Sequence, residues 1–381
     1  MSSSVNKDLR WEYYLILRNA MFGDFWKGHL SEKDRSVLFV LGLGFDPRMC
    51  SGLRAVIDAG GGGDRECLLI EYDEGPASPS REHMDLVEKN RVLVCNLLEN
   101  RGIIKSCPLQ MWSADGRRIG ARAASSLFKN FSELEKYSDI VVDIGAMPRG
   151  VYFPIIAKLL YLLDSTARIN GGRLPVNLHV IVAEDVGLDS RIREEGIDEN
   201  ASYLHGFSSD LALEASANIP KVWIPVLGEG KEAQLIRIYD HVIPDEICPV
   251  IPSPSVDPRR GDALILEYME LLFDRFRVEP RNILYAAEKN PFEVYRQIYR
   301  TSIHYYDALD AVDGCRVVVS AVSSKLLSIG ALLASYELKQ KGYQIGISNV
   351  ESQGYKMESL PEDTADQEEL FSMWLAGECY E

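Results

Sequence analysis

Several common signals are missing from this 381-residue chain, and each absence excludes a class of function. The chain has no basic excess, because 41 Lys and Arg stand against 57 Asp and Glu, giving a net charge of -16. This balance disfavours a nucleic-acid backbone or an anionic membrane as the main partner, since both attract basic surfaces. No apolar run approaches the roughly 20 residues that span a bilayer. The first residues also lack the charged-then-apolar pattern of a signal peptide, so we expect a cytoplasmic protein without membrane contact.

Metal and disulfide patterns are missing as well. The seven cysteines are scattered, without a Cys-x-x-Cys or Cys/His pairing, so neither a metal site nor a disulfide framework is predicted. His205 lies in a polar, glycine-containing loop and is a catalytic candidate by residue type. It has no paired nucleophile and no metal-ligand spacing, and we interpret it as a surface histidine. The 46% of hydrophobic residues suffices for a full core in one large domain or two.

Apolar strand-like runs alternate with helical patterns along the whole chain. The predicted strands are 36–41, 67–74, 106–112, 139–143, 177–183, 221–228, 234–239, 281–287, 315–322 and 343–350. The predicted helices are 49–59, 81–101, 121–134, 151–163, 261–276, 291–311 and 326–341. This alternation predicts an α/β fold, Rossmann-like, with mainly parallel sheet, flanking helices and two α/β halves.

Composition changes along the chain suggest where these halves begin and end. We predict a Rossmann-like domain over 1–245 with N-terminal aromatic helices, a proline-rich linker or strap over 246–260, a second half over 261–357 and an acidic tail over 358–381. The prolines of the linker exclude helix and remove backbone donors. The aromatic segment 9–30 and the tail, which carries a short amphipathic piece, are candidate contacts for protein partners.

The stretch 36–48 combines a strand, the glycine turn Gly42-x-Gly44 and the start of a helix. Glycines at such a turn can adopt positive φ and let a ligand approach the backbone, while the free N–H groups of the helix start face an anion or carboxylate. Glu71 ends the next strand, where a Rossmann-like sheet places an acceptor for ribose hydroxyls. A solvated strand end is the alternative interpretation of Glu71.

The order of these motifs resembles that of class I, Rossmann-fold S-adenosylmethionine-dependent methyltransferases. The resemblance is carried by Gly42-x-Gly44-x-Asp46-x-Arg48, Glu71, Ala114-Asp115-Gly116 and the run from Asp139 to Asp143. It implies that Gly42 and Gly44 approach the cofactor, that Glu71 takes the ribose and that Asp115 meets the adenine. The Gly-x-Gly-x-Asp-x-Arg form is similar to the carboxyl methyltransferase branch, in which the arginine, here Arg48, pairs with the cofactor carboxylate.

This resemblance covers roughly residues 36 to 150. No Asn/Asp-Pro-Pro-Tyr/Phe follows the strand that ends at Asp143, which leaves Asp143 as the candidate general base. Methyl transfer needs mainly proximity and orientation, so the lack of an acid-base pair does not exclude it. The prediction is a protein that binds a nucleoside-containing ligand, with S-adenosylmethionine as cofactor and methyl transfer to an unknown substrate.

A second candidate site lies at Ser323, Ser324 and Lys325, where a predicted strand runs into a helix. Two hydroxyls, free helix N–H groups and a lysine suit a phosphate or carboxylate. The alternative is a serine N-cap followed by a solvated lysine. Two further hypotheses follow: a nucleotide sensor without chemistry of its own, and a structural subunit of a bacterial multi-protein system.

Overall fold

The protein was analysed as a computed structural model, which describes residues 8–75, 78–169, 171–172, 174, 176–185, 188, 191–208, 219–312, 314–357 and 368–380. Contacts divide the chain into two units. Unit 1 comprises Met1–Tyr13 and Ile197–Glu351, and unit 2 comprises Tyr14–Gly196 and Ser352–Glu381. The chain therefore leaves and re-enters each unit, and neither unit is one continuous stretch of sequence.

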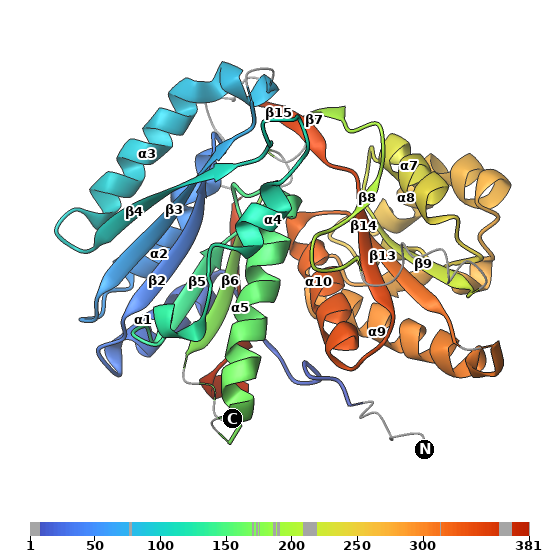
Figure 1. The fold of residues 1–381 in the computed structure, drawn as a ribbon. Helices are drawn as coiled ribbons and strands as arrows, with labels where there is room; N and C mark the ends of the chain where they lie inside the picture. Colours follow the sequence, from blue (N-terminus) through green and yellow to red (C-terminus); the bar gives the residue numbers. More distant parts are fainter. Residues whose placement is uncertain are drawn as a thin grey trace. The chain divides into compact units, whose positions relative to one another are not determined.

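The sheet of unit 2 has the strand order β1-β16-β6-β5-β2-β3-β4 (Figure 1). Its strands are β1 (Leu15–Arg18), β2 (Val37–Leu43), β3 (Arg65–Asp73), β4 (Ile103–Gln110), β5 (Asp139–Asp143), β6 (Asn177–Glu184) and β16 (Glu369–Ala376). The strands from β2 to β6 are parallel, whereas β16 pairs antiparallel with both β6 and β1. Two further strands, β7 (Ile192–Ile197) and β15 (Ser352–Met357), form a separate pair.

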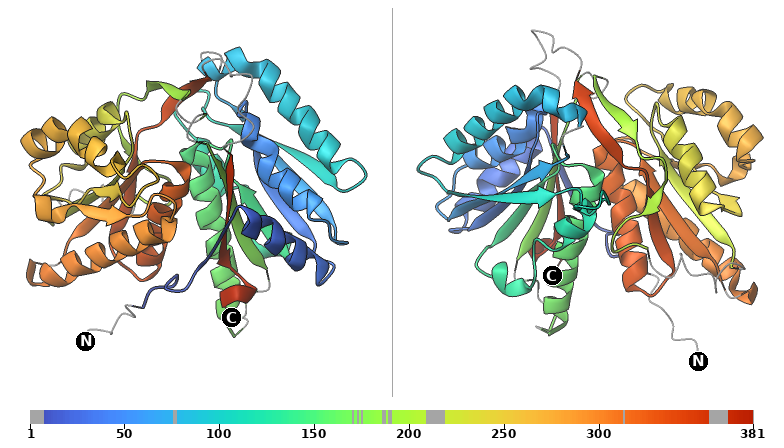
Figure 2. Two further views of the ribbon diagram at one scale, coloured as in Figure 1. Left: turned by 180° about the vertical axis from the view of Figure 1, so that it is seen from behind. Right: turned by 45° about the horizontal axis from the view of Figure 1, so that its top comes forward.

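Helices cover both faces of this sheet. They are α1 (Ala20–Ser31), α2 (Ser51–Asp58), α3 (Met84–Leu98), α4 (Gly120–Ser125) and α5 (Arg149–Ile169). Side chains of α1, α2 and α3 form one apolar cluster with β2 and β3, and α5 lies over the opposite face (Figure 2). Because both faces are covered, β2 and β5 are buried at every residue, which explains the apolar sequence of β2 and of the interior of β5, Ile140 to Val142.

The main sheet of unit 1 has the order β12-β11-β9-β13-β14-β8, with β10 paired beside β9. Its strands are β8 (Ser202–Tyr203), β9 (Lys221–Leu227), β10 (Glu246–Ile247), β11 (Val250–Pro252), β12 (Leu284–Ala286), β13 (Arg316–Val322) and β14 (Ile345–Asn349). Only β8 runs antiparallel among these described strands. The helices are α7 (Glu232–Val242), α8 (Arg260–Glu267), α9 (Pro291–Ala308) and α10 (Lys325–Gln340).

The parallel strands of both sheets follow the same path. With the short β10 left out, the first strand in each unit is central, the second and third extend the sheet on one side, and the fourth and fifth on the other. The order therefore reverses between β2 and β5 in unit 2, and between β9 and β13 in unit 1. In doubly wound sheets ligands bind beyond the carboxyl ends of the strands at such a switch point. The predicted fold class, α/β with mainly parallel sheets, is confirmed.

The predicted domain boundaries are wrong. The segment predicted as a linker, 246–260, contributes β10 and β11 to the sheet of unit 1, where Val250 pairs with Val226. Extended backbone fits both a linker and a strand, so proline content did not distinguish them. The segment predicted as an acidic tail contains β16, a mostly buried strand between β1 and β6. Residues 358–367 and 381 of that predicted tail lie outside the described residues.

Two local predictions also need correction. Residues 234–239, predicted as a strand, lie in α7, where Leu235, Ile238 and Val242 recur on one buried helical face. The aromatic segment 9–30, predicted as helices, contains the strand β1 before α1, because pairing with β16 overrides the local pattern. No helix in the described part of the chain is both long and apolar enough to cross a bilayer.

Candidate functional site

Side chains and backbone from the neighbouring strand and loop pack closely against the glycine turn at the end of β2. A Cβ at Gly42 would collide with the Tyr72 hydroxyl and lie 2.8 Å from Met147 Cγ, and a Cβ at Gly44 would lie 3.0 Å from Ala146 Cβ. The Tyr72 hydroxyl donates to the Ala146 carbonyl at 2.7 Å, which ties β3 to the loop after β5. Neither glycine has a positive φ, so the turn does not use this freedom of glycine. Close packing, not backbone freedom, requires both glycines.

Glu71 lies beside this turn, because it pairs in register with Leu43. Arg91 of α3 donates to both of its carboxylate oxygens, at 2.7 and 3.0 Å, and the Ser106 hydroxyl donates to one of them. The hydrogen bonds from Arg91 lower the pKa of Glu71, so the side chain is ionised at neutral pH. A carboxylate has about four acceptor positions, and these donors use three. One acceptor position is left for a ligand hydroxyl.

Asp46 and Arg48 form an ion pair between β2 and α2, and each residue is only 7% exposed. Arg48 donates from Nε at 3.0 Å and from Nη2 at 2.8 Å to the two oxygens of Asp46. Asn90 of α3 fixes the same loop by donating to the carbonyls of Gly44 and Asp46, at 2.8 and 2.9 Å. Nothing in the helical pattern around Asn90 marks this contact, and sequence reasoning missed it.

Asp143 is held inside the protein at the carboxyl end of β5. The residue is 5% exposed, and its Oδ1 accepts the N–H of Gly145 at 2.9 Å. A Cβ on Gly52 would collide with the other carboxylate oxygen, so α2 passes close to Asp143. These contacts order the loop after β5 and place a carboxylate at the switch point. Its role as a general base stays a prediction.

Glu368, just before β16, adds a carboxylate to this end of the sheet. It hydrogen-bonds to Ser51 and interacts with the charges of Arg48, Asp46 and Asp185. Loss of hydration raises the pKa of Glu368, and the two aspartates raise it further against the opposing effects of Ser51 and Arg48. We call the group formed by Asp46, Arg48, Asp143, Asp185 and Glu368 the acidic edge. It carries four carboxylates against one guanidinium.

Asp115 lies in an exposed turn between β4 and α4. Its side chain is 56% exposed and pairs with Arg117 at 2.6 Å, while the Ser113 hydroxyl donates to it at 2.5 Å. The Ser113 N–H donates to the Arg117 carbonyl at 2.8 Å and closes the turn. The contacts of Asp115 are therefore local to this turn. Its assignment to the adenine stays a prediction.

In unit 1, Ser323, Ser324 and Lys325 lie where β13 leads into α10. Ser324 is the N-cap of α10, because its hydroxyl accepts the N–H of Leu327 at 3.3 Å. This contact is the one that the N-cap interpretation requires. Lys325 is the first residue of the helix. Anion binding at these three residues stays a prediction.

Sequence reasoning missed a second strand–glycine turn–helix unit, Gly228-x-Gly230, which follows β9 and precedes α7. A Cβ at Gly228 would lie 2.8 Å from the Val322 carbonyl, so the ends of β9 and β13 approach closely. Glu229, between the glycines, pairs with Arg260 at 2.5 and 2.9 Å. The signal was in the sequence, because the apolar run 221–227 ends in this turn.

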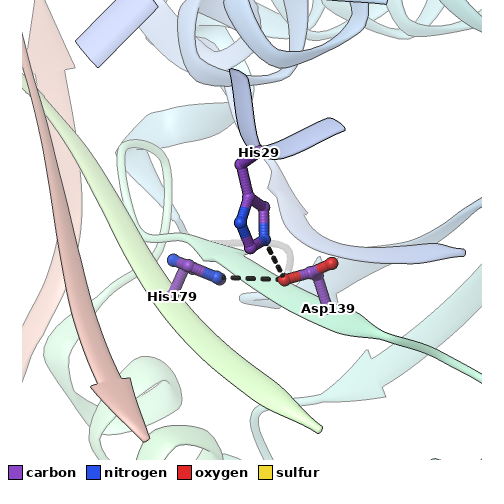
Figure 3. A group of neighbouring side chains, drawn as sticks. All are labelled: His29, Asp139 and His179. Atoms are coloured by element: carbon purple, nitrogen blue, oxygen red, sulfur yellow. Dashed lines mark hydrogen bonds and ion pairs between the residues drawn. The ribbon is translucent and has the colours of Figure 1, made fainter. Parts of the chain in front are cut away.

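A separate polar cluster lies at the amino-terminal ends of β5 and β6 (Figure 3). His29 Nε2 lies 2.8 Å and His179 Nε2 3.2 Å from Asp139 Oδ1, which also accepts a hydrogen bond from Asn177 at 2.9 Å. Arg35 Nη1 lies 3.7 Å from Asp139 Oδ2. Burial acts to raise the pKa of Asp139, but the hydrogen bonds and charges of His179 and His29 lower it overall. Burial lowers the pKa of His179.

Sequence spacing gave no sign of this cluster. His29 and His179 lie 110 and 40 residues from Asp139 along the chain. They come from α1 and β6, which meet β5 only in the folded unit. The prediction that the chain has no metal site rested on spacing alone and took no account of such a group.

No protein-family model matches the chain, and neither does any curated protein. A universal stress protein from Archaeoglobus fulgidus is similar at 10% identity and a TM-score of 0.23, over 83% of this chain and 96% of that one. A protein of unknown function from Pseudomonas aeruginosa PAO1 is similar at 13% identity and a TM-score of 0.21, over 83% and 92%. An uncharacterized protein from Mycobacterium paratuberculosis is similar at 8% identity and a TM-score of 0.20, over 84% of this chain and 85% of that one. These TM-scores are below 0.5, so the similarities carry no inference about function.

Proposed function

We propose that unit 2 binds a nucleoside-containing ligand at the carboxyl ends of β2 and β5. The observation that carries the proposal is the position of the glycine loop, Glu71 and Asp143 around one switch point. Ligands of doubly wound sheets bind at this place. Glu71 retains an acceptor position for a ribose hydroxyl beside the glycine loop, which fits the role that the methyltransferase resemblance implies.

The charge of the acidic edge favours a cationic ligand. The acidic edge has four carboxylates and one arginine, and Arg48 is already paired with Asp46. The phosphates of ATP or NAD would be repelled here, whereas a sulfonium and an amino group would be attracted. S-adenosylmethionine carries both cationic groups and is the ligand that we propose. Its carboxylate would share Arg48 with Asp46.

The reaction that we propose is methyl transfer to an unidentified nucleophile. The nucleophile attacks the methyl carbon, the carbon–sulfur bond breaks, and sulfur keeps the electron pair, so that neutral S-adenosylhomocysteine sulfur results. The protein contributes mainly proximity and orientation. Where the nucleophile must lose a proton, Asp143 is the carboxylate proposed to accept it.

Calorimetric titration of the full chain with S-adenosylmethionine, S-adenosylhomocysteine, ATP and NAD tests the binding. We expect micromolar affinity for the two adenosyl ligands and its loss in Gly44→Asp, which adds bulk and negative charge against Ala146. Gly230→Asp is the matched control, because it makes the same change at the other glycine turn, where a Cβ meets no atom within 4 Å. Wild-type protein that binds neither adenosyl ligand would overturn the proposal, as would equal loss in both variants.

The same titration separates the two alternatives. Binding of ATP alone, lost in Lys325→Ala and retained in Gly44→Asp, would favour a nucleotide sensor that uses Ser323, Ser324 and Lys325. This alternative is favoured by one observation: α10 begins at the switch point of unit 1, and the amino-terminal end of a helix favours an anion. Binding of none of the four ligands would favour a structural subunit.

A further inference from the structure

We propose that His29, Asp139 and His179 form a binding site for a divalent transition-metal ion, with Zn²⁺ as the ion to test first. The site lies in unit 2, at the amino-terminal ends of the strands and therefore at the opposite end from the acidic edge. It does not depend on the function proposed above.

The three side chains converge from three separate elements. One donor atom of each lies within 4.8 Å of the others, and both imidazole Nε2 atoms point at the Asp139 carboxylate (Figure 3). Ligand atoms of a tetrahedral zinc ion with bonds of about 2.0–2.2 Å lie roughly 3.3 Å apart. The observed separations from Asp139 Oδ1 are 2.8 Å for His29 and 3.2 Å for His179. All three donor atoms lie within 4.8 Å of one another, so a shift of the side chains would bring them around one ion.

The donor set suits a transition metal. Imidazole nitrogens favour Zn²⁺ and its neighbours, and two histidines with one carboxylate recur in such sites. The carboxylate also has spare capacity. Three donors crowd Asp139 Oδ1, while Oδ2 accepts no hydrogen bond within the described part of the chain. An ion held by the two Nε2 atoms and Oδ1 would replace the two imidazole hydrogen bonds, and Asn177 would continue to orient the carboxylate.

Arg35 and Arg65 make their hydrogen bonds to other groups, and Arg35 is in addition ion-paired with Asp139 Oδ2 at 3.7 Å. Arg35 donates to both oxygens of Glu378, at 3.3 and 2.8 Å, and so has a carboxylate of its own. Arg65 directs its guanidinium to backbone carbonyls, including that of Arg35 at 2.7 Å. Asp139 is 0% exposed, and a buried carboxylate is expected to be paired or to coordinate a metal. A bound cation would share the negative charge of Asp139 with Arg35.

Aromatic rings enclose the two histidines. Trp26 and Trp374 lie 4.8 and 4.9 Å from the His179 ring, and Phe25 stacks on His29 at 5.0 Å. This shell limits rotation of both imidazoles and excludes water from the site. A bound ion would join α1, β5 and β6, so its binding energy would contribute to the stability of unit 2.

The test uses the full chain, stripped with a chelator and then titrated with Zn²⁺ and Co²⁺. We expect one Zn²⁺ per chain by elemental analysis, ligand-field absorption with Co²⁺, and a higher melting temperature when Zn²⁺ is added. His179→Gln and Asp139→Asn are expected to weaken Zn²⁺ binding at least tenfold and to abolish the absorption. The control is His304→Gln, which changes an exposed histidine of α9 and is expected to bind like wild type.

Two results would contradict the proposed metal site. One is wild-type protein that takes up no ion and gives no Co²⁺ absorption, which would leave a hydrogen-bonded cluster. The other is uptake that survives His179→Gln and Asp139→Asn, which would place the ion elsewhere. Circular dichroism establishes whether each variant folds. If both fail to fold, the wild-type Co²⁺ spectrum decides, because absence of nitrogen-ligand bands contradicts the proposal.

Discussion

The two switch points share a topology and differ in their chemistry. In each unit a central strand ends in a Gly-x-Gly turn and a helix follows, at Gly42-x-Gly44 in unit 2 and Gly228-x-Gly230 in unit 1. In unit 2 the first glycine makes room for a tyrosine side chain, whereas in unit 1 it makes room for backbone at the end of β13. The ion pair of unit 2 is buried, but Glu229 in unit 1 is 52% exposed.

This difference shows what the topology decides. It determines where polar groups gather, because the loops after the first and fourth parallel strands meet at the switch point. It does not decide which ligand they suit, since unit 2 presents buried carboxylates and unit 1 presents hydroxyls and a lysine. Function must therefore be argued from the side chains of each unit.

The largest expected effect concerns the two ion pairs. Arg48→Met leaves the buried Asp46 carboxylate without its partner, and we expect a loss of about 3 kcal/mol in the free energy of unfolding. Glu229→Gln in unit 1 removes the half-exposed partner of Arg260, which keeps its ion pair with Glu288, and we expect about 1 kcal/mol or less. Urea unfolding of both variants measures the difference. Equal losses would contradict the contrast between a buried and an exposed pair.

Substitution of a glycine in each of the two turns is expected to lower the free energy of unfolding by a smaller amount. Gly42→Ala forces a Cβ against the Tyr72 hydroxyl and is expected to cost about 2 kcal/mol. Gly230→Ala meets no atom within 4 Å but has a φ of +69°, so about 1 kcal/mol is expected.

A double-mutant cycle with Tyr72→Phe isolates the cause. Loss of the hydroxyl removes the closest contact, and the cost of Gly42→Ala is expected to fall when both changes are combined. A cost that stays the same would show that Tyr72 is not the obstacle.

The smallest expected effect is on the pH dependence of stability. Hydrogen bonds from Arg91 lower the pKa of Glu71. For Glu229, burial acts to raise the pKa, but Arg260 outweighs it and lowers the value. Both folded-state values lie below the ordinary 4.5, so each contribution is present above that pH and is lost as pH falls through the folded-state pKa.

Acid unfolding of two variants measures these contributions. Glu71→Gln and Glu229→Gln are each expected to reduce the loss of stability below pH 4.5. The change in the free energy of unfolding is expected to be less than about 1 kcal/mol, because both carboxylates are partly exposed. The Glu71 effect is expected to be the larger, since its carboxylate is 27% exposed against 52% for Glu229. The reverse order would contradict this ranking.

Local periodicity predicted most central elements and several residues at their ends. The strands 36–41 and 139–143 correspond to β2 and β5, and Glu71 was placed correctly beside the glycine turn. Sequence reasoning failed where pairing with a distant strand decided the structure. Residues 369–376 were predicted as part of a tail, yet they form a strand that pairs with both β1 and β6. Strand pairing is non-local, and a window of sequence does not contain the partner.

The sequence by itself determined the α/β class, the glycine turn after β2 and the acids at strand ends, because these follow from local spacing of apolar and polar residues. Only the tertiary structure decided that Tyr72 packs against Gly42, that Asn90 holds the loop and that His29, Asp139 and His179 meet. It also decided that each unit is built from separate stretches of chain. The physical reason is that packing joins residues by their positions in space, which local periodicity does not specify.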